Sequence, residues 1–196
     1  MTLTPLTERE AVAVDLGPCD YLEVAPFDPD ARYPELRGEG VSTSPNPAYR
    51  AVREALRLSG LDAARFDTPA WNPLGAYVRH GETVLLKPNL VKESHPRDPD
   101  GWRYVLTHGS VIRAVADYVF LALEGRGRVV VADAPQTDSS YRRIAELLHL
   151  DDLTRHYRAQ GLDFAAVDLR KEEWRNEGGA IVHRETLAGD PEGYAA

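Results

Sequence analysis

Short apolar runs recur between residues 82 and 169, and polar or turn residues separate them. The runs are residues 83–86 (TVLL), 128–132 (RVVVA) and 164–167 (FAAV). Continuous apolar runs of this length are typical of strands in a parallel sheet whose two faces are both covered. The pattern therefore predicts three buried strands in one sheet.

Helical periodicity fills the gaps between these strands. Residues 111–124 read as a mostly buried helix capped by Ser110, whose few polar positions are Arg113, Asp117 and Glu124. A second helix is expected over 140–148, and a third from a cap at Asp151 to Gly161. Strands that alternate with helices at this spacing predict an α/β fold, a three-layer, mostly parallel, doubly wound (Rossmann-like) sheet.

The N-terminal part of the chain has a weaker pattern. Residues 10–16 and 20–24 are strand-like and are predicted to form a hairpin through Gly17-Pro18, whereas the proline-rich stretch 26–47 has no sustained period. A helix then begins at Pro47, with Asn46 as its N-cap and Gly60 as its C-cap.

These patterns predict two regions. Residues 1–47 would form N-terminal strands and an irregular wrapping segment, and residues 48–196 an α/β domain. Residues 171–177 are charged, and one more strand is expected at 180–182 before an abrupt end. The ending favours the N-terminal part of a longer protein, although a short frayed terminus explains it equally simply.

Composition narrows the classes of partner. The formal net charge of −8 over 196 residues argues against nucleic acid or an anionic membrane as the main partner. No apolar run approaches the roughly 20 residues of a spanning helix, and residues 1–11 lack the features of a secretory signal. A single cysteine, Cys19, excludes an iron–sulfur cluster held by this chain alone and favours a reducing, cytoplasmic compartment.

Two predicted strands end in polar residues that a simple loop does not require. Lys87 and Asn89 follow the first strand, and Asp133 ends the second, with Gln136 and Thr137 leading into a helix N-terminus that favours an anion. Ligands of open parallel sheets bind outside the carboxyl ends of the strands, so these residues are the candidate site. The alternative is that they are solvated strand exits and helix caps.

The segment between the first strand and the next helix supports the same location. Residues 90–106 are 17 residues without clear periodicity, and they carry Lys92, Glu93, His95, Arg97 and Arg103. Loops of this length in a compact domain are usually functional or disordered. The segment is expected either to close over an acidic substrate as a lid or to be a solvated excursion.

His108 enters the buried helix at the same end of the predicted sheet. It is a candidate general base or metal ligand, or a helix-entry residue bonded to backbone. The other histidines have no ligand-like spacing. The chain also lacks a Walker loop, a dinucleotide-binding glycine motif after a strand, and a G-x-S-x-G elbow.

Several of these segments resemble one known family. The runs TVLLKPNLV, THGSVIRAVADYVF and GRVVVADAP, with the upstream YRAVREALRLSGLD and WNPLG, are similar to the family called domain of unknown function 362 over roughly residues 45–170. Members usually have Thr-His-Pro where this chain has Thr107-His108-Gly109, which keeps the histidine but changes how rigidly its loop is held.

The resemblance implies a larger working unit. Members tend to be longer, with further lysine and histidine motifs in a second half, and some carry a ferredoxin-like cluster domain. Similar proteins are encoded among bacterial genes for glycan or natural-product biosynthesis. The resemblance thus implies that this chain acts with a missing C-terminal half or as a homo-oligomer.

The leading functional hypothesis is an enzyme domain acting on a small anionic metabolite, phosphorylated or carboxylated. Lys87 would neutralise the anion, Asp133 would act as a base or bind a divalent metal, and His108 would shuttle a proton. Asn89, Lys92, Gln136 and Thr137 would contact the substrate. The alternatives are a non-catalytic binding or assembly module, and an accessory protein to an iron–sulfur redox partner.

Overall fold

The computed structural model describes residues 12–18, 20–36, 40–95, 97–98, 100–178 and 180–187. The chain divides into two compact units that alternate along the sequence. The first unit comprises residues 1–84 and 110–128, and the second comprises residues 85–109 and 129–196. The predicted boundary at residue 47 stays a prediction.

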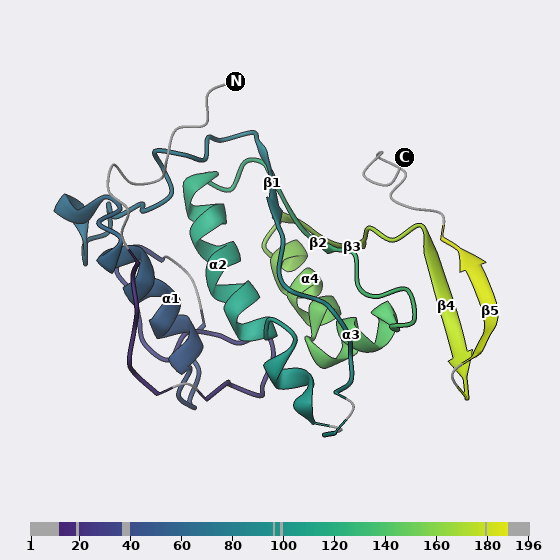
Figure 1. Cartoon of the computed structure of the whole chain (residues 1–196). Helices are drawn as coiled ribbons and strands as arrows, with labels where there is room; N and C mark the ends of the chain where they lie inside the picture. Colours follow the sequence, from purple (N-terminus) through teal and green to yellow (C-terminus); the bar gives the residue numbers. More distant parts are fainter. Residues whose placement is uncertain are drawn as a thin grey trace. The chain divides into compact units, whose positions relative to one another are not determined.

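Helices and strands alternate through most of the chain (Figure 1). Their bounds are α1 Pro47–Leu58, η1 Ala63–Arg65, β1 Thr83–Leu86, η2 Gly101–Tyr104, α2 Gly109–Ala122, β2 Arg128–Asp133, α3 Tyr141–Leu147, α4 Leu150–Ala159, β3 Asp163–Asp168, β4 Glu172–Glu177 and β5 Ala180–Thr186. β1, β2 and β3 form one parallel sheet with β2 in its centre, and β4 pairs with β5. The predicted α/β, Rossmann-like alternation is confirmed.

Helix α1 begins where its sequence predicts. The side chain of Asn46 accepts a hydrogen bond from the backbone N–H of Tyr49 at 3.2 Å, and Pro47 occupies the first helical position. The same side chain donates to the carbonyl oxygen of Phe27 at 2.9 Å. The helix ends at Leu58 with Ser59 as its C-cap, and Gly60 follows with a φ of 75°, a conformation that suits glycine.

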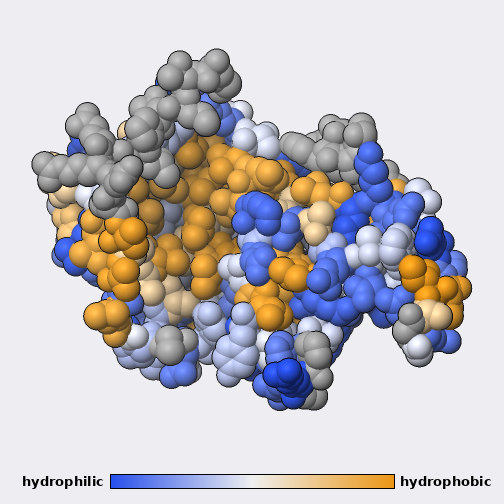
Figure 2. Space-filling view, in the orientation of Figure 1, coloured by the Kyte–Doolittle hydropathy of each residue, from blue (hydrophilic) through white to orange (hydrophobic). Residues whose placement is uncertain are grey.

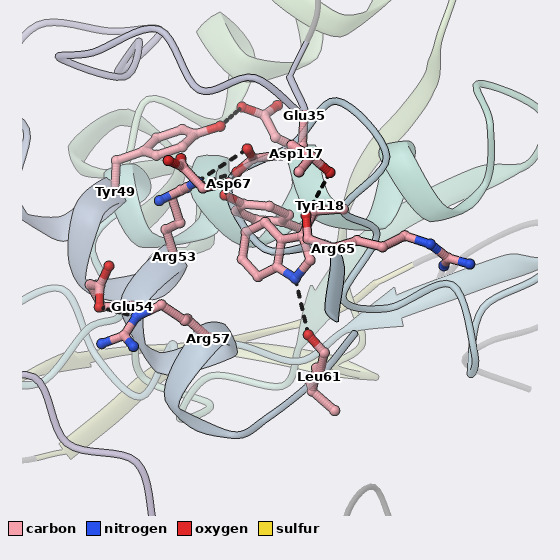
Figure 3. Close-up of polar contacts among 12 residues, drawn as sticks. Glu35, Tyr49, Arg53, Glu54, Arg57, Leu61, Arg65, Asp67, Asp117 and Tyr118 are labelled. Atoms are coloured by element: carbon pink, nitrogen blue, oxygen red, sulfur yellow. Dashed lines mark hydrogen bonds and ion pairs between the residues drawn. The ribbon is translucent and has the colours of Figure 1, made fainter. Parts of the chain in front are cut away.

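The first unit encloses a charged residue inside an aromatic cluster (Figure 3). Arg53 of α1 donates from Nε to Glu35 Oε1 at 2.7 Å, and its guanidinium lies 5.2 Å from the ring centroid of Trp71. Tyr118 of α2 donates to the same Glu35 oxygen at 2.8 Å. Each buried charge of the Arg53–Glu35 pair therefore has a partner, as burial of charge requires.

Helix α2 buries its polar residues as well as its apolar ones. Arg113 Nε lies 2.9 Å from Asp117 Oδ2, and Tyr49 donates to that oxygen at 2.6 Å. The prediction of a mostly buried helix is confirmed. Helix α2 begins at Gly109, so the buried Ser110 lies in its first turn and not at the predicted cap position.

The second unit contains the sheet, apart from the first residues of β1 and β2. β2 is buried along nearly its whole length, as its run of valines predicts. β1 is an edge strand whose residues alternate between exposed and half-buried, and Leu85 is 49% exposed. Because β1 lies at the edge of the sheet, its side chains are less covered than those of the central strand β2. The prediction that both faces of β1 are covered is therefore wrong.

Two other predictions are corrected. Residues 12–16 and 20–24 form no strand, and the apolar Val12 and Leu16 are exposed, so the predicted hairpin is wrong in the described residues. Residues 10–11 and Cys19 lie outside them, as do residues 193–196. Helix α4 begins at Leu150 rather than after a cap at Asp151.

The charged segment after β3 forms strand β4, which its charged composition did not predict. β4 pairs antiparallel with β5, and Arg184 lies over the ring of Trp174 at 4.6 Å from the centroid. Figure 2 shows this hairpin as mainly hydrophilic, with one smaller hydrophobic cluster. Among the described residues, no helix has the length and apolar character needed to cross a membrane.

Candidate functional site

The carboxyl ends of β1, β2 and β3 lie side by side in the second unit. The backbone N–H of Leu169, after β3, donates to the carbonyl oxygen of Asp133 at the end of β2 (2.9 Å). The N–H of Gln136 donates to the carbonyl oxygen of Val91, after β1, also at 2.9 Å. We call the three exits, residues 87–93, 133–139 and 168–173, the carboxyl edge.

Lys87 and Asp133 form an ion pair at this edge. Lys87 Nζ lies 2.9 Å from Asp133 Oδ1, and the second carboxylate oxygen accepts the N–H of Leu90 at 2.7 Å. The two side chains differ in exposure, 65% for Lys87 against 10% for Asp133. The structure therefore brings together the two residues predicted from the strand ends, with the carboxylate fixed inside and the ammonium facing solvent.

The protonation of Asp133 follows from these contacts. Burial alone would raise its pKa, but hydrogen bonds from Lys87 and from the backbone N–H groups of Leu90 and Ala134 outweigh burial and lower the pKa below its ordinary value. Asp133 is thus ionised at neutral pH. An ionised carboxylate of lowered pKa is a weak proton acceptor, and its charge-assisted hydrogen bonds hold the donor groups around it in place.

Asn89 closes the base of the 90–106 segment. Its backbone N–H donates to Thr107 Oγ1, and its side-chain Nδ2 donates to the carbonyl oxygen of Val105, both at 2.9 Å. The N–H of Thr107 returns a bond to the carbonyl oxygen of Asn89. Asn89 is predicted to orient a substrate through donor or acceptor groups; its side-chain nitrogen is engaged, which leaves the side-chain oxygen of this exposed residue for that role.

His108 lies in a different environment from the exposed Lys87. It is buried, and its ring stacks on that of Trp102 with centroids 5.9 Å apart and an interplanar angle of 16°. The helix-entry interpretation fits this burial better than the proton-shuttle interpretation, because a shuttle must reach both the ligand and a proton acceptor.

Lys92 binds the exit of β2 rather than solvent. Its Nζ lies 2.7 Å from Asp138 Oδ2, which also accepts from Asn176 Nδ2 at 3.2 Å. The hydrogen bond from Lys92 holds the pKa of Asp138 below its ordinary value. Nearby, Ser139 Oγ donates to Glu93. The start of the long loop is therefore anchored to the β2 exit.

Gln136 and Thr137, both predicted ligand contacts, have exposed side chains and engaged backbones. The carbonyl oxygen of Thr137 accepts the N–H of Trp174 on β4 at 2.6 Å, and that of Gln136 accepts the N–H of Ser139 at 2.9 Å. These two side chains therefore project from a turn whose main chain is fixed.

Sequence reasoning missed the third strand end. β3 ends at Asp168, and Arg170 follows two residues later with its side chain buried against Asp168 and Glu173. The strand-end rule that selected Lys87 and Asp133 selects Asp168 as well, so this signal was available in the sequence.

The carboxyl edge is acidic in total. Its residues include four cations, Lys87, Lys92, Arg170 and Lys171, and six carboxylates, Glu93, Asp133, Asp138, Asp168, Glu172 and Glu173. Nevertheless, in the described part of the chain no group of three or more His, Cys, Asp or Glu side chains is arranged to hold a metal ion. The expected metal-binding role of Asp133 therefore lacks companion ligands among these residues.

Comparison with known proteins gives one family. A family model described as Domain of unknown function (DUF362) matches residues 84–188, more than half of the chain and the whole of the carboxyl edge. No curated protein and no solved structure matches the chain.

Proposed function

The chain belongs to the DUF362 family, a domain of unknown function. We propose that its second unit binds a small anionic metabolite at the carboxyl edge. The ligand is phosphorylated or carboxylated, and the unit is part of an enzyme that acts on it. The proposed setting is the bacterial cytoplasm, in glycan or natural-product biosynthesis, which the single cysteine and the family resemblance support.

One observation carries the proposal, namely the position of the Lys87 ammonium. Asp133 and the carbonyl oxygen of Pro88 (3.3 Å) hold it on one side, while most of the side chain is exposed. An ammonium has three N–H donors, so one remains for a ligand oxygen. Because the pair is already formed, binding an anion requires little reordering of the lysine.

In this proposal Asp133 positions Lys87 and does not accept a proton. Its lowered pKa makes it a poor base at neutral pH. Its bonds to Lys87 and to the N–H of Leu90 join the exits of β1 and β2, so the carboxylate fixes where the ammonium points.

The remaining contacts would come from the surrounding exits. Gln136 and Thr137 would donate hydrogen bonds to the anionic group of the ligand, and Asn89 would offer its side-chain oxygen to a donor on the ligand. Lys92 would join only by leaving Asp138, its present partner at 2.7 Å. The buried His108 is not part of the proposed contact set.

The acidic surroundings limit the kind of ligand. An anion at Lys87 must compete with the neighbouring carboxylates, which favours a small ligand with one or two negative charges over a polyanion. We therefore expect affinity for the isolated anion to be weak and to fall with rising salt.

A thermal-shift screen of phosphorylated and carboxylated metabolites, with and without divalent cations, tests the proposal. Three proteins are compared, the wild type, Lys87→Ala and Arg158→Ala. Arg158 is an exposed arginine of α4 in the same unit, so its removal makes the same charge change outside the carboxyl edge. A stabilisation lost in Lys87→Ala and kept in Arg158→Ala supports the proposal, and equal stabilisation of all three contradicts it.

A second candidate, an assembly module without catalysis, is favoured by β5. All its residues are exposed, including the apolar Ile181 and Val182, and it pairs only with β4 among the described strands. Sedimentation of the wild type and Ile181→Lys decides this, since an assembly through β5 predicts a larger species that the charge disrupts. A monomer in both proteins removes this candidate. No observation favours an accessory role beside an iron–sulfur protein.

A further inference from the structure

Arg170 uses every N–H donor of its guanidinium. Nε bonds both oxygens of Asp168 at 3.0 and 3.1 Å, and Nη2 bonds Asp168 Oδ2 and Glu173 Oε2, each at 2.7 Å. Nη1 donates to the carbonyl oxygens of Gln136 at 3.0 Å and Ser139 at 2.6 Å. A guanidinium has five such donors, so none is left for a ligand.

The two carbonyl groups bracket one turn, residues 136–139. The N–H of Ser139 donates to the carbonyl oxygen of Gln136 across this turn at 2.9 Å. Between them lie Thr137, whose side chain is exposed, and Asp138, which holds Lys92. Arg170 thus hydrogen-bonds to both ends of the turn that carries the proposed ligand contacts Gln136 and Thr137.

The same residue joins this turn to β4. Glu173 belongs to β4, and the N–H of Trp174 donates to the carbonyl oxygen of Thr137. The Arg170 side chain is only 3% exposed, so its burial is tolerated because two carboxylates and two carbonyl groups replace water. A lysine keeps the charge but concentrates its three donors on one atom, and cannot bond all four groups at once.

We propose that Arg170 is a positioning residue for the ligand site, holding the turn 136–139 in the geometry that binds the anion without touching the ligand itself. This inference rests on the proposed function for its ligand. Whether Arg170 holds the turn can be measured in the protein without any ligand.

The first measurement is the calorimetric affinity of the whole chain for inorganic phosphate. It compares the wild type with Arg170→Lys and with Arg158→Lys, a matched change at an exposed arginine of α4. We expect Arg170→Lys to weaken phosphate binding about tenfold or more, equivalent to about one lost charge-assisted hydrogen bond. Arg158→Lys should bind as the wild type does.

The second measurement is hydrogen exchange of backbone amides without ligand. In Arg170→Lys, the amides of Gln136, Ser139 and Trp174 should exchange roughly tenfold faster, because the turn loses the bonds from the guanidinium and opens locally. The amide of Leu153, bonded to the carbonyl oxygen of His149 within α4, should be unchanged.

The outcomes distinguish the two claims, that Arg170 holds the turn 136–139 and that this turn binds the ligand. If amide exchange at residues 136–139 is unchanged in Arg170→Lys, Arg170 does not hold the turn. Acceleration that extends equally to α4, or local acceleration with unchanged phosphate affinity, overturns the positioning role. A wild type that binds no phosphate counts against the proposed function, and the exchange pattern still decides whether Arg170 holds the turn.

Discussion

The ammonium of Lys87 lies 2.9 Å from Asp133 Oδ1, which joins the residue after β1 to the last residue of β2. The two residues are separated by 46 positions in the sequence and meet because parallel strands end at the same edge of a sheet. The pair is asymmetric, since the carboxylate is buried and the ammonium is open to solvent. A fixed anion thus directs an accessible cation.

Replacing Asp133 should cost stability because its carboxylate serves several donors. We expect Asp133→Asn to lower the free energy of unfolding by about 1–3 kcal/mol, since the charge-assisted bonds from Lys87 and the N–H of Leu90 are weakened. Urea unfolding measures the change. Asp151→Asn, at an exposed position of α4, is the control and should change stability by less than about 1 kcal/mol. Equal effects would mean that Asp133 has no special structural role.

The lowered pKa of Asp133 predicts how stability depends on pH. A carboxyl whose folded pKa lies below its ordinary value of 3.8 contributes its full stabilisation above that value and loses it as the pH falls towards the folded pKa. The free energy of unfolding should therefore decrease below about pH 4, with a slope of up to about 1.4 kcal/mol per pH unit from this one proton.

The control for this dependence is Asp133→Asn, which has no proton to bind at this position. Its unfolding free energy should fall less steeply below about pH 4, with a remaining slope from other carboxyls of lowered pKa such as Asp138. Identical slopes in wild type and variant, measured by urea unfolding at a series of pH values, would contradict the assigned pKa direction.

The buried pair in the first unit gives a separate stability prediction (Figure 3). Among the described residues, Arg53→Met leaves the buried Glu35 with the hydroxyl of Tyr118 as its remaining partner, so we expect a loss of about 3–5 kcal/mol in unfolding free energy. Arg53→Met combined with Glu35→Gln should be more stable than the single variant, because the unpaired charge is gone.

An exposed arginine supplies the comparison for Arg53. Arg65 pairs with Asp62 at 3.2 Å and is largely exposed, so Arg65→Met should cost less than about 1 kcal/mol. Chemical unfolding of all three variants gives the differences. If Arg53→Met and Arg65→Met are equally mild, the aromatic cluster tolerates an unpaired Glu35 and the account of this network is wrong.

The fold was predictable where local pattern and packing agree. The valine run of β2 predicts a buried central strand, and Asn46-Pro47 fixes the start of α1. The apolar alternation at residues 12–16 failed, because alternation produces a strand only when a neighbouring strand pairs with it. β4 was missed for the opposite reason, since its pairing with β5 forms a strand from a charged sequence.

The site was predictable in outline only. Parallel topology brings Lys87 to Asp133, and a strand-end rule finds both residues from sequence. The burial of His108 against Trp102 and the use of the Asn89 amide to close a loop depend on tertiary contacts that no local pattern contains. The bonds of Arg170 to the carbonyl oxygens of Gln136 and Ser139 join segments about 30 positions apart and are likewise hidden from sequence.

The most direct test of the central claim is a calorimetric titration of inorganic phosphate into the wild type, Lys87→Ala and Arg158→Ala at low ionic strength. If Lys87 provides the anion contact, phosphate binds the wild type and Arg158→Ala alike, and Lys87→Ala binds at least about tenfold more weakly, as expected for one lost charge-assisted hydrogen bond. Phosphate affinity that is equal in the wild type and Lys87→Ala would contradict the claim.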